Sequence, residues 1–410
     1  RAVNKRWIGD LKFANCDFLG NGRTQKASGR AIFMVGGQGV ATLTVTNCTF
    51  GGQMYTSAAE STGSGAAIYL ANYGRLVADG SLFVTNGMAK ANQGTQAGGS
   101  YGSAVYGYNT PVTMRRTRFS GNCNAVKVAN GDGGTVYLEG VIGGSAFTNC
   151  VFTGNYELRR DSNSNTRGGA LVLNPSSATA AIDIESCTFA YNLSQAGASA
   201  SALTVRTGDV TVHNSIFWKN LHGLTTVTGY GSDIDVAAGT LNISHSIMTG
   251  MDIAQIHDAT GSAITLDSET VYTDNPSFVT SDEEFEAMFT ESASNYLNPN
   301  SNWTYAKAAS LDVHLLSPQG YFMNDGTTGP ATNVFSAAID KGDPTSVYSN
   351  EPTPNGGRVN LGAYGNTEEA SQTPTGQPAV TLVATTEDGV TRPKAVVTMG
   401  LASGVDYQAT

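Results

Sequence analysis

A short sequence motif recurs every 28 to 37 residues along the first two thirds of this chain, and this repeat limits the possible folds more than any other feature. Its marker is an aromatic position that opens the pattern Phe-x-x-Asn in six repeats, for example FAYN at 189–192. Aligned repeats give one column: Phe18, Phe50, Phe83, Phe119, Phe152, Phe189, Phe217 and Met248. Self-similarity at a period of roughly 20–50 residues is the signature of stacked repeat units.

A change of phase within each repeat marks a bend between two short strands. Inward side chains of a strand alternate, so they share parity until the chain turns. Leu43 and Val45 are odd, whereas Cys48 and Phe50 are even, and other repeats show the same switch. Asn tolerates the left-handed conformation better than most residues, and it occupies the switch in four repeats: Asn15, Asn47, Asn149 and Asn214. Each repeat therefore contains at least three short strands.

Short strands that turn repeatedly in one sense predict an all-β solenoid, a parallel β-helix of about eight coils. A β-propeller has a similar period, but its antiparallel hairpins need turn dipeptides such as Asn-Gly at regular positions, and these are scarce here. The 49 glycines and the 14% share of charged residues also favour many short strands joined by tight turns.

Four of the five cysteines lie two residues before a repeat aromatic and belong to an inward column. The column also contains Ser and Thr, so we interpret it as a packing position that accepts small residues: Cys16, Cys48, Ser81, Thr117, Cys150, Cys187, Ser215 and Ser246. A disulfide between neighbouring coils is the alternative, although parallel in-register side chains suit its geometry poorly. The Asn of Phe-x-x-Asn is expected to stack at a corner, where its amide bonds the next coil.

The Gly-Gly-Ala-aliphatic phrases paired with Phe-x-x-Asn resemble the repeats of the chlamydial polymorphic outer-membrane proteins. More broadly, they resemble bacterial right-handed β-helix proteins of the pectate-lyase-like class. RGGALVL (167–173) followed by FAYN carries the resemblance most clearly, and it extends over residues 11–275. Residues 335–371 also look like the terminal block of secreted bacterial β-helix proteins. The resemblance implies a right-handed solenoid and a role in surface adhesion, polysaccharide cleavage or neither.

The sequence divides into three parts. Residues 1–275 are the predicted β-helix, and the period is lost after them. Residues 276–371 are interpreted as an irregular C-terminal coil and cap, because the last coil of a solenoid needs covering. Residues 372–410 have linker composition followed by the start of a possible β-sandwich domain. The first residue is Arg, and we expect this sequence to be part of a longer secreted product.

Charge and hydropathy argue against some partners. The net charge of −10 disfavours nucleic acid and anionic membranes. No apolar run approaches the roughly 20 residues that a membrane-spanning helix needs, so this segment is not predicted to be an integral membrane protein.

Unequal loops at one corner are the predicted place for a binding site. The connections at 51–64, 87–101 and 156–167 are long, and they emerge on one side of the stacked coils. Aromatic rings with Arg and carboxylates suit a glycan. The candidate ligand-binding residues are Tyr55, Lys90, Tyr101, Tyr156, Arg159, Arg160, Asp161 and Arg167. Solvated loops without a ligand are the alternative interpretation.

Catalytic patterns are weak. Tyr156 with Arg159, Arg160 and Arg167 could serve a β-eliminating lyase, but no spacing requires it. The acidic phrases of the polygalacturonases are absent from the sequence. His213 and His245 fall at bends and are expected to be exposed corner residues. Asp340 and Asp343 are expected to form a turn, with Ca²⁺ binding as the alternative and no other cofactor or metal foreseen.

The sequence therefore predicts a secreted or cell-surface β-helix protein whose role is adhesion or glycan binding, with a polysaccharide or cell-surface glycan as partner. A polysaccharide lyase acting on a uronate-containing glycan is the first alternative. A structural spacer in a large surface protein is the second.

Overall fold

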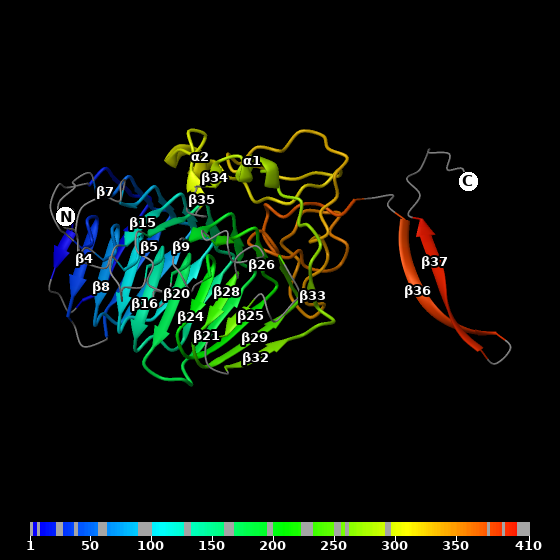
Figure 1. Cartoon of the computed structure of the whole chain (residues 1–410), viewed down its shortest axis with the longest axis horizontal. Coiled ribbons are helices and arrows are strands. Elements are labelled where there is room, and N and C mark those ends of the chain that lie inside the picture. The colour runs from blue at the N-terminus through cyan, green and yellow to red at the C-terminus, as the bar shows by residue number, and fades with distance from the viewer. Residues whose placement is uncertain are drawn as a thin grey trace.

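The computed structural model describes residues 3–5, 9–21, 28–36, 40–55, 64–88, 101–126, 133–159, 168–194, 200–222, 233–249, 256–258, 262–291, 297–374, 378–387 and 390–399. The chain forms a parallel β-solenoid, as the sequence predicts (Figure 1). Among these residues, three sheets contain nine strands each, close to the about eight coils expected, and a fourth sheet of six short strands follows the third sheet in six of the coils.

The strands of each sheet pair in parallel with the equivalent strands of neighbouring coils. Sheet A contains β1 (Val3–Lys5), β4 (Ile32–Val35), β8 (Ile68–Ala71), β12 (Val105–Tyr108), β16 (Val136–Gly140), β20 (Leu171–Pro175), β24 (Leu203–Val205), β28 (Ile234–Val236) and β31 (Ile256–Asp258). Sheet B contains β2 (Leu11–Ala14), β5 (Thr42–Thr46), β9 (Arg75–Asp79), β13 (Val112–Arg115), β17 (Ser145–Thr148), β21 (Ala181–Glu185), β25 (Asp209–His213), β29 (Thr240–Ser244) and β32 (Ala263–Leu266). Sheet C contains β3 (Asp17–Leu19), β6 (Thr49–Gly51), β10 (Leu82–Val84), β14 (Arg118–Ser120), β18 (Val151–Thr153), β22 (Thr188–Ala190), β26 (Ile216–Trp218), β30 (Ser246–Met248) and β33 (Val271–Tyr272). Sheet D contains β7 (Met54–Tyr55), β11 (Gly87–Met88), β15 (Cys123–Val126), β19 (Tyr156–Arg159), β23 (Leu193–Ser194) and β27 (Leu221–His222).

The bend between sheets B and C is built on left-handed residues, which confirms the phase argument. Asn15, Asn47, Asn149 and Asn214 have φ of 53°, 49°, 53° and 52°. Arg116 occupies the same corner with a φ of 43°. A left-handed backbone costs a residue with a Cβ roughly 1–2 kcal/mol, and Asn offsets part of this cost through local hydrogen bonds.

The aromatic column forms a continuous stack inside the solenoid. Successive rings from Phe18 to Phe217 lie 4.6–4.8 Å apart between centroids, with interplanar angles of 1–13°. Met248 continues the column in register with Phe217. The spacing equals the distance between neighbouring strands, so the strand register itself produces the stack.

The column that contains the cysteines is hydrogen-bonded as well as packed. All five cysteines are free thiols, which excludes the disulfide alternative. The expectation that size alone unites this column was incomplete, because each side chain also donates to the carbonyl oxygen two residues earlier. The Cys187 thiol donates to Glu185 at 3.3 Å, and the Ser215 hydroxyl donates to His213 at 2.9 Å. Ser215 also accepts from the Cys187 backbone N–H at 3.0 Å, so Cys, Ser and Thr satisfy the same position.

The Asn residues of Phe-x-x-Asn form the predicted ladder at the corner after sheet C. The Asn155 amide donates to Phe119 of the preceding coil and to Asn192 of the next, both at 2.9 Å. Its oxygen accepts from the amide of Asn122 at 2.9 Å and from the backbone N–H of that residue at 3.1 Å. Asn86, Asn122, Asn155, Asn192 and Asn220 repeat this pattern, and all are buried.

Asp233 ends the ladder, where it accepts from the Asn220 amide at 2.9 Å. Burial raises the pKa of Asp233 from its ordinary value of 3.8 to about 6. The folded state therefore holds this proton more tightly than the unfolded chain, and stability falls as the pH rises from about 4 to about 6. We expect Asp233→Asn to flatten the pH dependence of the urea midpoint in this window and to be more stable than the wild type above pH 6.

Asp209→Asn, at an exposed site on sheet B, provides the matched control and should keep the wild-type profile. An unchanged pH profile in Asp233→Asn would show that the buried carboxyl does not control this transition.

The described residues of 276–371 lie against the outer side of sheet C. This segment contains α1 (Asp282–Glu286), β34 (Phe289–Glu291), β35 (Leu297–Pro299) and α2 (Tyr305–Ser310). Tyr191 packs against Phe285 with centroids 4.8 Å apart, and Trp218 donates to Asp282 at 3.0 Å. The sequence predicts a cap on the last coil, whereas these contacts extend back along the side of earlier coils. Beyond residue 374, β36 (Pro378–Glu387) and β37 (Val390–Met399) pair as an antiparallel hairpin.

Candidate functional site

A side cleft of about 1060 Å³ lies between the B–C bend of the solenoid and the segment 314–369. Its solenoid wall runs across five neighbouring coils, from Asp79 to Asn214. Four strand spacings of about 4.8 Å make this wall roughly 19 Å long. The cleft therefore has the shape for an extended ligand rather than a compact one.

The solenoid wall carries three arginines within four residues, in the sequence RRTR at 115–118. Arg115 ends β13, Arg116 occupies the left-handed bend, and Arg118 begins β14. Arg116 forms a two-pronged pair with Asp79 of the preceding coil, with N–O distances of 2.9 and 2.8 Å. Thr148 and Glu185 continue the wall in the next two coils, in register with Arg115.

The bend asparagines hold the opposite wall in place. The Asn149 amide donates to the carbonyl oxygens of Ala363 at 3.0 Å and Gly365 at 2.8 Å. The Asn214 oxygen accepts from the Asp343 N–H at 2.7 Å, and its amide donates to Ser346 at 2.9 Å. The left-handed corner thus turns these side chains outward, where they attach the irregular segment to the rod.

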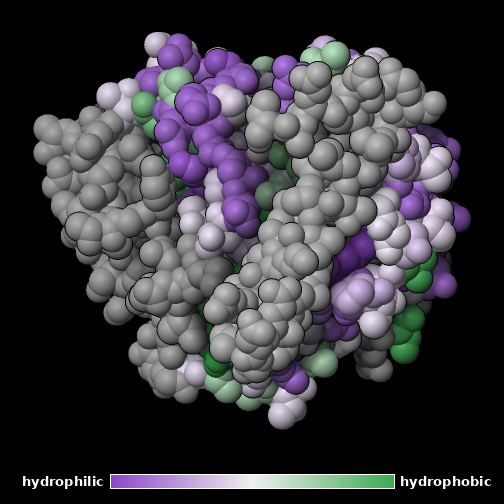
Figure 2. Space-filling model, turned by 90° about the vertical axis from the view of Figure 1, so that its right-hand side faces the viewer, coloured by the Kyte–Doolittle hydropathy of each residue, from purple (hydrophilic) through white to green (hydrophobic). Residues whose placement is uncertain are grey.

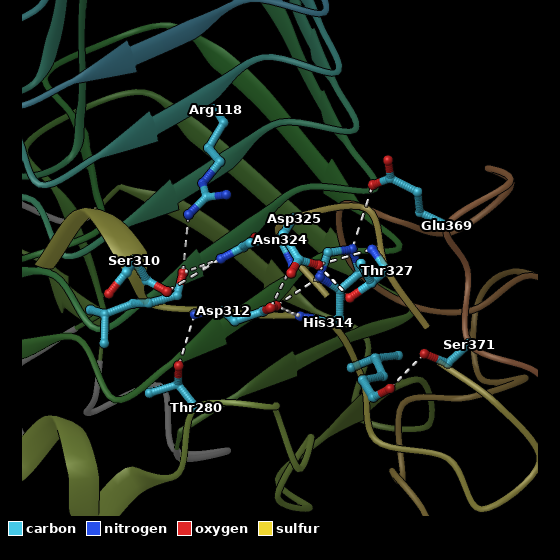
Figure 3. A network of polar contacts seen from close by, with 12 residues as sticks. Arg118, Thr280, Ser310, Asp312, His314, Asn324, Asp325, Thr327, Glu369 and Ser371 are labelled. Atoms are coloured by element: carbon cyan, nitrogen blue, oxygen red, sulfur yellow. Dashed lines mark hydrogen bonds and ion pairs between the residues drawn. The ribbon is translucent and has the colours of Figure 1, made fainter. Parts of the chain in front are cut away.

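A buried polar network supports the same wall (Figure 3). His314 is 1% exposed, with Nδ1 2.7 Å from an Asp312 oxygen and Nε2 3.4 Å from a Glu369 oxygen. Burial opposes protonation of His314, but the hydrogen bonds of both carboxylates outweigh it and raise its pKa. The Tyr364 ring stacks on this imidazole with centroids 3.6 Å apart. Both ring nitrogens are engaged, so the arrangement stabilises the wall and does not present a base to the cleft.

The arginines that line the cleft were not among the residues selected from the sequence. Selection followed loop length, and the cleft lies at a corner whose connections are short. The signal that could have found it is the RRTR run at a bend where equivalent positions of other coils carry Asn, Gly, Ser or His.

Of the residues selected from the sequence, the two whose side chains the structure describes, Tyr101 and Tyr156, do not line the cleft. Lys90, Arg160, Asp161 and Arg167 lie outside the described residues. Tyr55 and Arg159 lie in β7 and β19, and their side chains also lie outside the described part. Tyr156 in β19 is buried, with its ring 5.8 Å from that of Trp303 in the side segment.

Tyr101 is half-buried and joins an aromatic ladder on the outer face of sheet A. Phe33, Tyr69, Tyr106 and Tyr137 stack at centroid distances of 4.9, 5.0 and 6.0 Å, and Tyr101 lies 4.9 Å from Tyr137. Neighbouring rings cover one another's faces in this ladder. Sugar rings stack on aromatic faces, so the ladder is better suited to stabilising the sheet than to carbohydrate contact.

Asp343 forms the turn that the sequence predicts, because its carboxylate accepts from the N–H and hydroxyl of Thr345 at 2.7 and 2.8 Å. Asp340 also lies in a turn, with a left-handed φ of 57°, and its carboxylate accepts from the Thr373 hydroxyl. His213 and His245 lie at the bends but are half-buried rather than exposed. His213 lies 3.5 Å from a Glu185 oxygen, and its hydrogen bond lowers the pKa of that carboxyl.

The described surface in the end-on view of Figure 2 is mostly hydrophilic, and hydrophobic residues appear only as small separated spots. This view therefore offers no broad apolar surface on the residues that it colours. Among the described residues, no helix is long and apolar enough to cross a membrane.

No protein-family model, no curated protein and no solved structure matches this chain. The structure supports the parallel solenoid that the sequence resemblance implies.

Proposed function

We propose that this protein is a secreted or cell-surface β-helix protein that binds an extended glycan in the side cleft, and that its role is adhesion. The observation that carries the proposal is the lining of the cleft, which presents guanidinium, amide, hydroxyl and carboxylate groups from two walls along five coils. Glycan hydroxyls both donate and accept hydrogen bonds, and a lining that mixes both kinds of group suits them. The location outside the cell follows from the sequence resemblance and is part of the proposal.

Rigidity adds support for a binding role. The solenoid wall is held by the strand ladders, and the opposite wall is attached by buried or half-buried asparagines. A site that is already formed loses little conformational entropy when a ligand enters, and this favours affinity. Weak glycan contacts would therefore add up along a cleft of this length.

A glycan array with the whole chain tests the proposal. Thr148→Trp introduces a large ring in the middle of the solenoid wall, at an outward strand position that accommodates aromatic residues. We expect the wild type to be retained by at least one glycan, and Thr148→Trp to weaken retention by about tenfold or more.

Thr44→Trp is the control, because Thr44 points outward from the same sheet but does not line the cleft. Equal retention of both variants would move the site away from the cleft. No retention of the wild type by any glycan would contradict glycan binding and favour the spacer. Ultraviolet absorbance from unsaturated products, after incubation with uronate polymers, would indicate cleavage. It would favour the polysaccharide lyase over adhesion as the function.

A further inference from the structure

The three arginines of the cleft are not required by the solenoid. In register with Arg115 the neighbouring coils carry Asp79 and Thr148, and in register with Arg118 they carry Leu82 and Val151. At the bend position of Arg116, the other described coils carry Asn, Gly, Ser or His. A long cationic side chain at the left-handed corner also costs backbone energy. The packing of the rod explains none of these three choices.

Arg116 is neutralised by its partner. Its guanidinium pairs with both carboxylate oxygens of Asp79, at 2.9 and 2.8 Å. This pair leaves little net charge at this point of the wall, so it is a poor candidate for attracting an anion.

Arg118 is oriented but not neutralised. Its Nε donates to the Ser120 hydroxyl at 2.8 Å, and its Nη2 donates to the carbonyl oxygens of Ala309 at 2.9 Å and Leu311 at 3.3 Å. Figure 3 shows this side chain reaching from the solenoid toward the backbone of the side segment. All three acceptors are uncharged, and no carboxylate of the described residues lies within ion-pair distance of Arg118.

Arg115 is exposed and makes no hydrogen bond or ion pair with any residue in the described part of the chain. It lies three residues from Arg118 across the same bend, and both line the cleft. Among the carboxylates around them, Asp79 pairs with Arg116, Glu185 lies 3.5 Å from His213, and Glu369 lies 3.4 Å from His314, which Asp312 also contacts at 2.7 Å. Glu368 and Glu369 on the opposite wall are exposed. The cleft thus has two guanidinium groups without a hydrogen-bonded carboxylate on one wall, and two exposed carboxylates on the other.

We propose that Arg115 and Arg118 form an anion subsite, and that the cleft selects glycans carrying carboxylate or sulfate groups. This inference rests on the proposed function, and it adds the class of glycan. A guanidinium binds carboxylate or sulfate oxygens with paired N–H donors, a geometry that a neutral sugar cannot use to the same extent. Arg118, whose Nε and Nη2 already donate to the protein, supplies Nη1 as a preformed donor. The exposed Arg115 offers its paired N–H groups from the other side of the bend.

Titration calorimetry at two salt concentrations tests the subsite with three polymers: polygalacturonate, dextran sulfate and neutral dextran. We expect the wild type to bind one or both anionic polymers at least about tenfold more tightly than dextran, and binding to weaken with salt. Comparing the two anionic polymers distinguishes a carboxylate from a sulfate ligand. Arg115→Gln should weaken anionic binding by about tenfold or more and reduce the salt dependence.

Arg75→Gln is the matched control, because Arg75 lies on the same outer face of sheet B, outside the cleft, where it donates to Thr113 at 2.8 Å. It should leave binding unchanged. Equal affinity for dextran, or full anionic binding by Arg115→Gln, would overturn the subsite while glycan binding in the cleft stands. Absence of binding to every polymer here and to every glycan on the array would instead contradict the proposed function itself.

Discussion

Replacement of Phe119 by alanine is expected to lower the free energy of unfolding by about 3–5 kcal/mol, the usual range for removing a buried aromatic ring. Phe119 is fully buried and lies between Phe83 and Phe152, with centroid distances of 4.8 Å to each. The cavity would interrupt the stack, and neighbouring coils cannot close it because their hydrogen bonds fix the strand spacing. Urea unfolding followed by far-ultraviolet circular dichroism measures the change.

Phe335→Ala provides the control, because Phe335 is 42% exposed and lies in the side segment. It should change stability by less than about 0.5 kcal/mol, as surface substitutions usually do. Similar losses in both variants would show that the stack does not contribute more than any aromatic side chain.

Asn155→Leu is expected to destabilise the fold by about 3 kcal/mol or more. Its side chain makes four hydrogen bonds within the ladder, two as donor and two as acceptor. Leucine keeps the approximate volume but leaves the amide and N–H of Asn122, the carbonyl of Phe119 and the oxygen of Asn192 without this partner. Each unsatisfied buried group costs about 1–3 kcal/mol, and some of that cost is relieved by local rearrangement. The same urea experiment measures it.

The exposed Asn333 offers the comparison. Asn333→Ala should be close to neutral, within about 0.5 kcal/mol. If Asn155→Leu lowers the free energy of unfolding no more than Asn333→Ala does, the asparagine ladder does not stabilise the fold.

The prediction of the fold rested mainly on local sequence patterns. The parity switch between Val45 and Cys48 placed the left-handed Asn47, and the Phe-x-x-Asn pattern placed both the ring stack and the amide ladder. These features recur in most coils, so the same physical cause acts many times and produces a periodic sequence pattern. The hydrogen bonds of the Cys187 column were missed because Cys, Ser and Thr were compared by size only.

The cleft could not be predicted in the same way because its second wall has no period. Asn149 and Ala363 are hydrogen-bonded although they lie 214 positions apart in the sequence. No local sequence pattern around either residue predicts this contact. Loop length pointed instead to another corner, where Tyr156 proves to be buried. The unusual residues at 115–118 were visible in the repeat alignment, but their meaning depends on which segment faces them.

Hydrogen exchange of the whole protein, with and without the glycan that the array identifies, tests the central claim most directly, namely that this glycan binds in the side cleft. The account predicts added protection at 115–118 and 363–369, with little change around Tyr101 and in β19. Protection confined to those two places, with 115–118 and 363–369 unchanged, would contradict it.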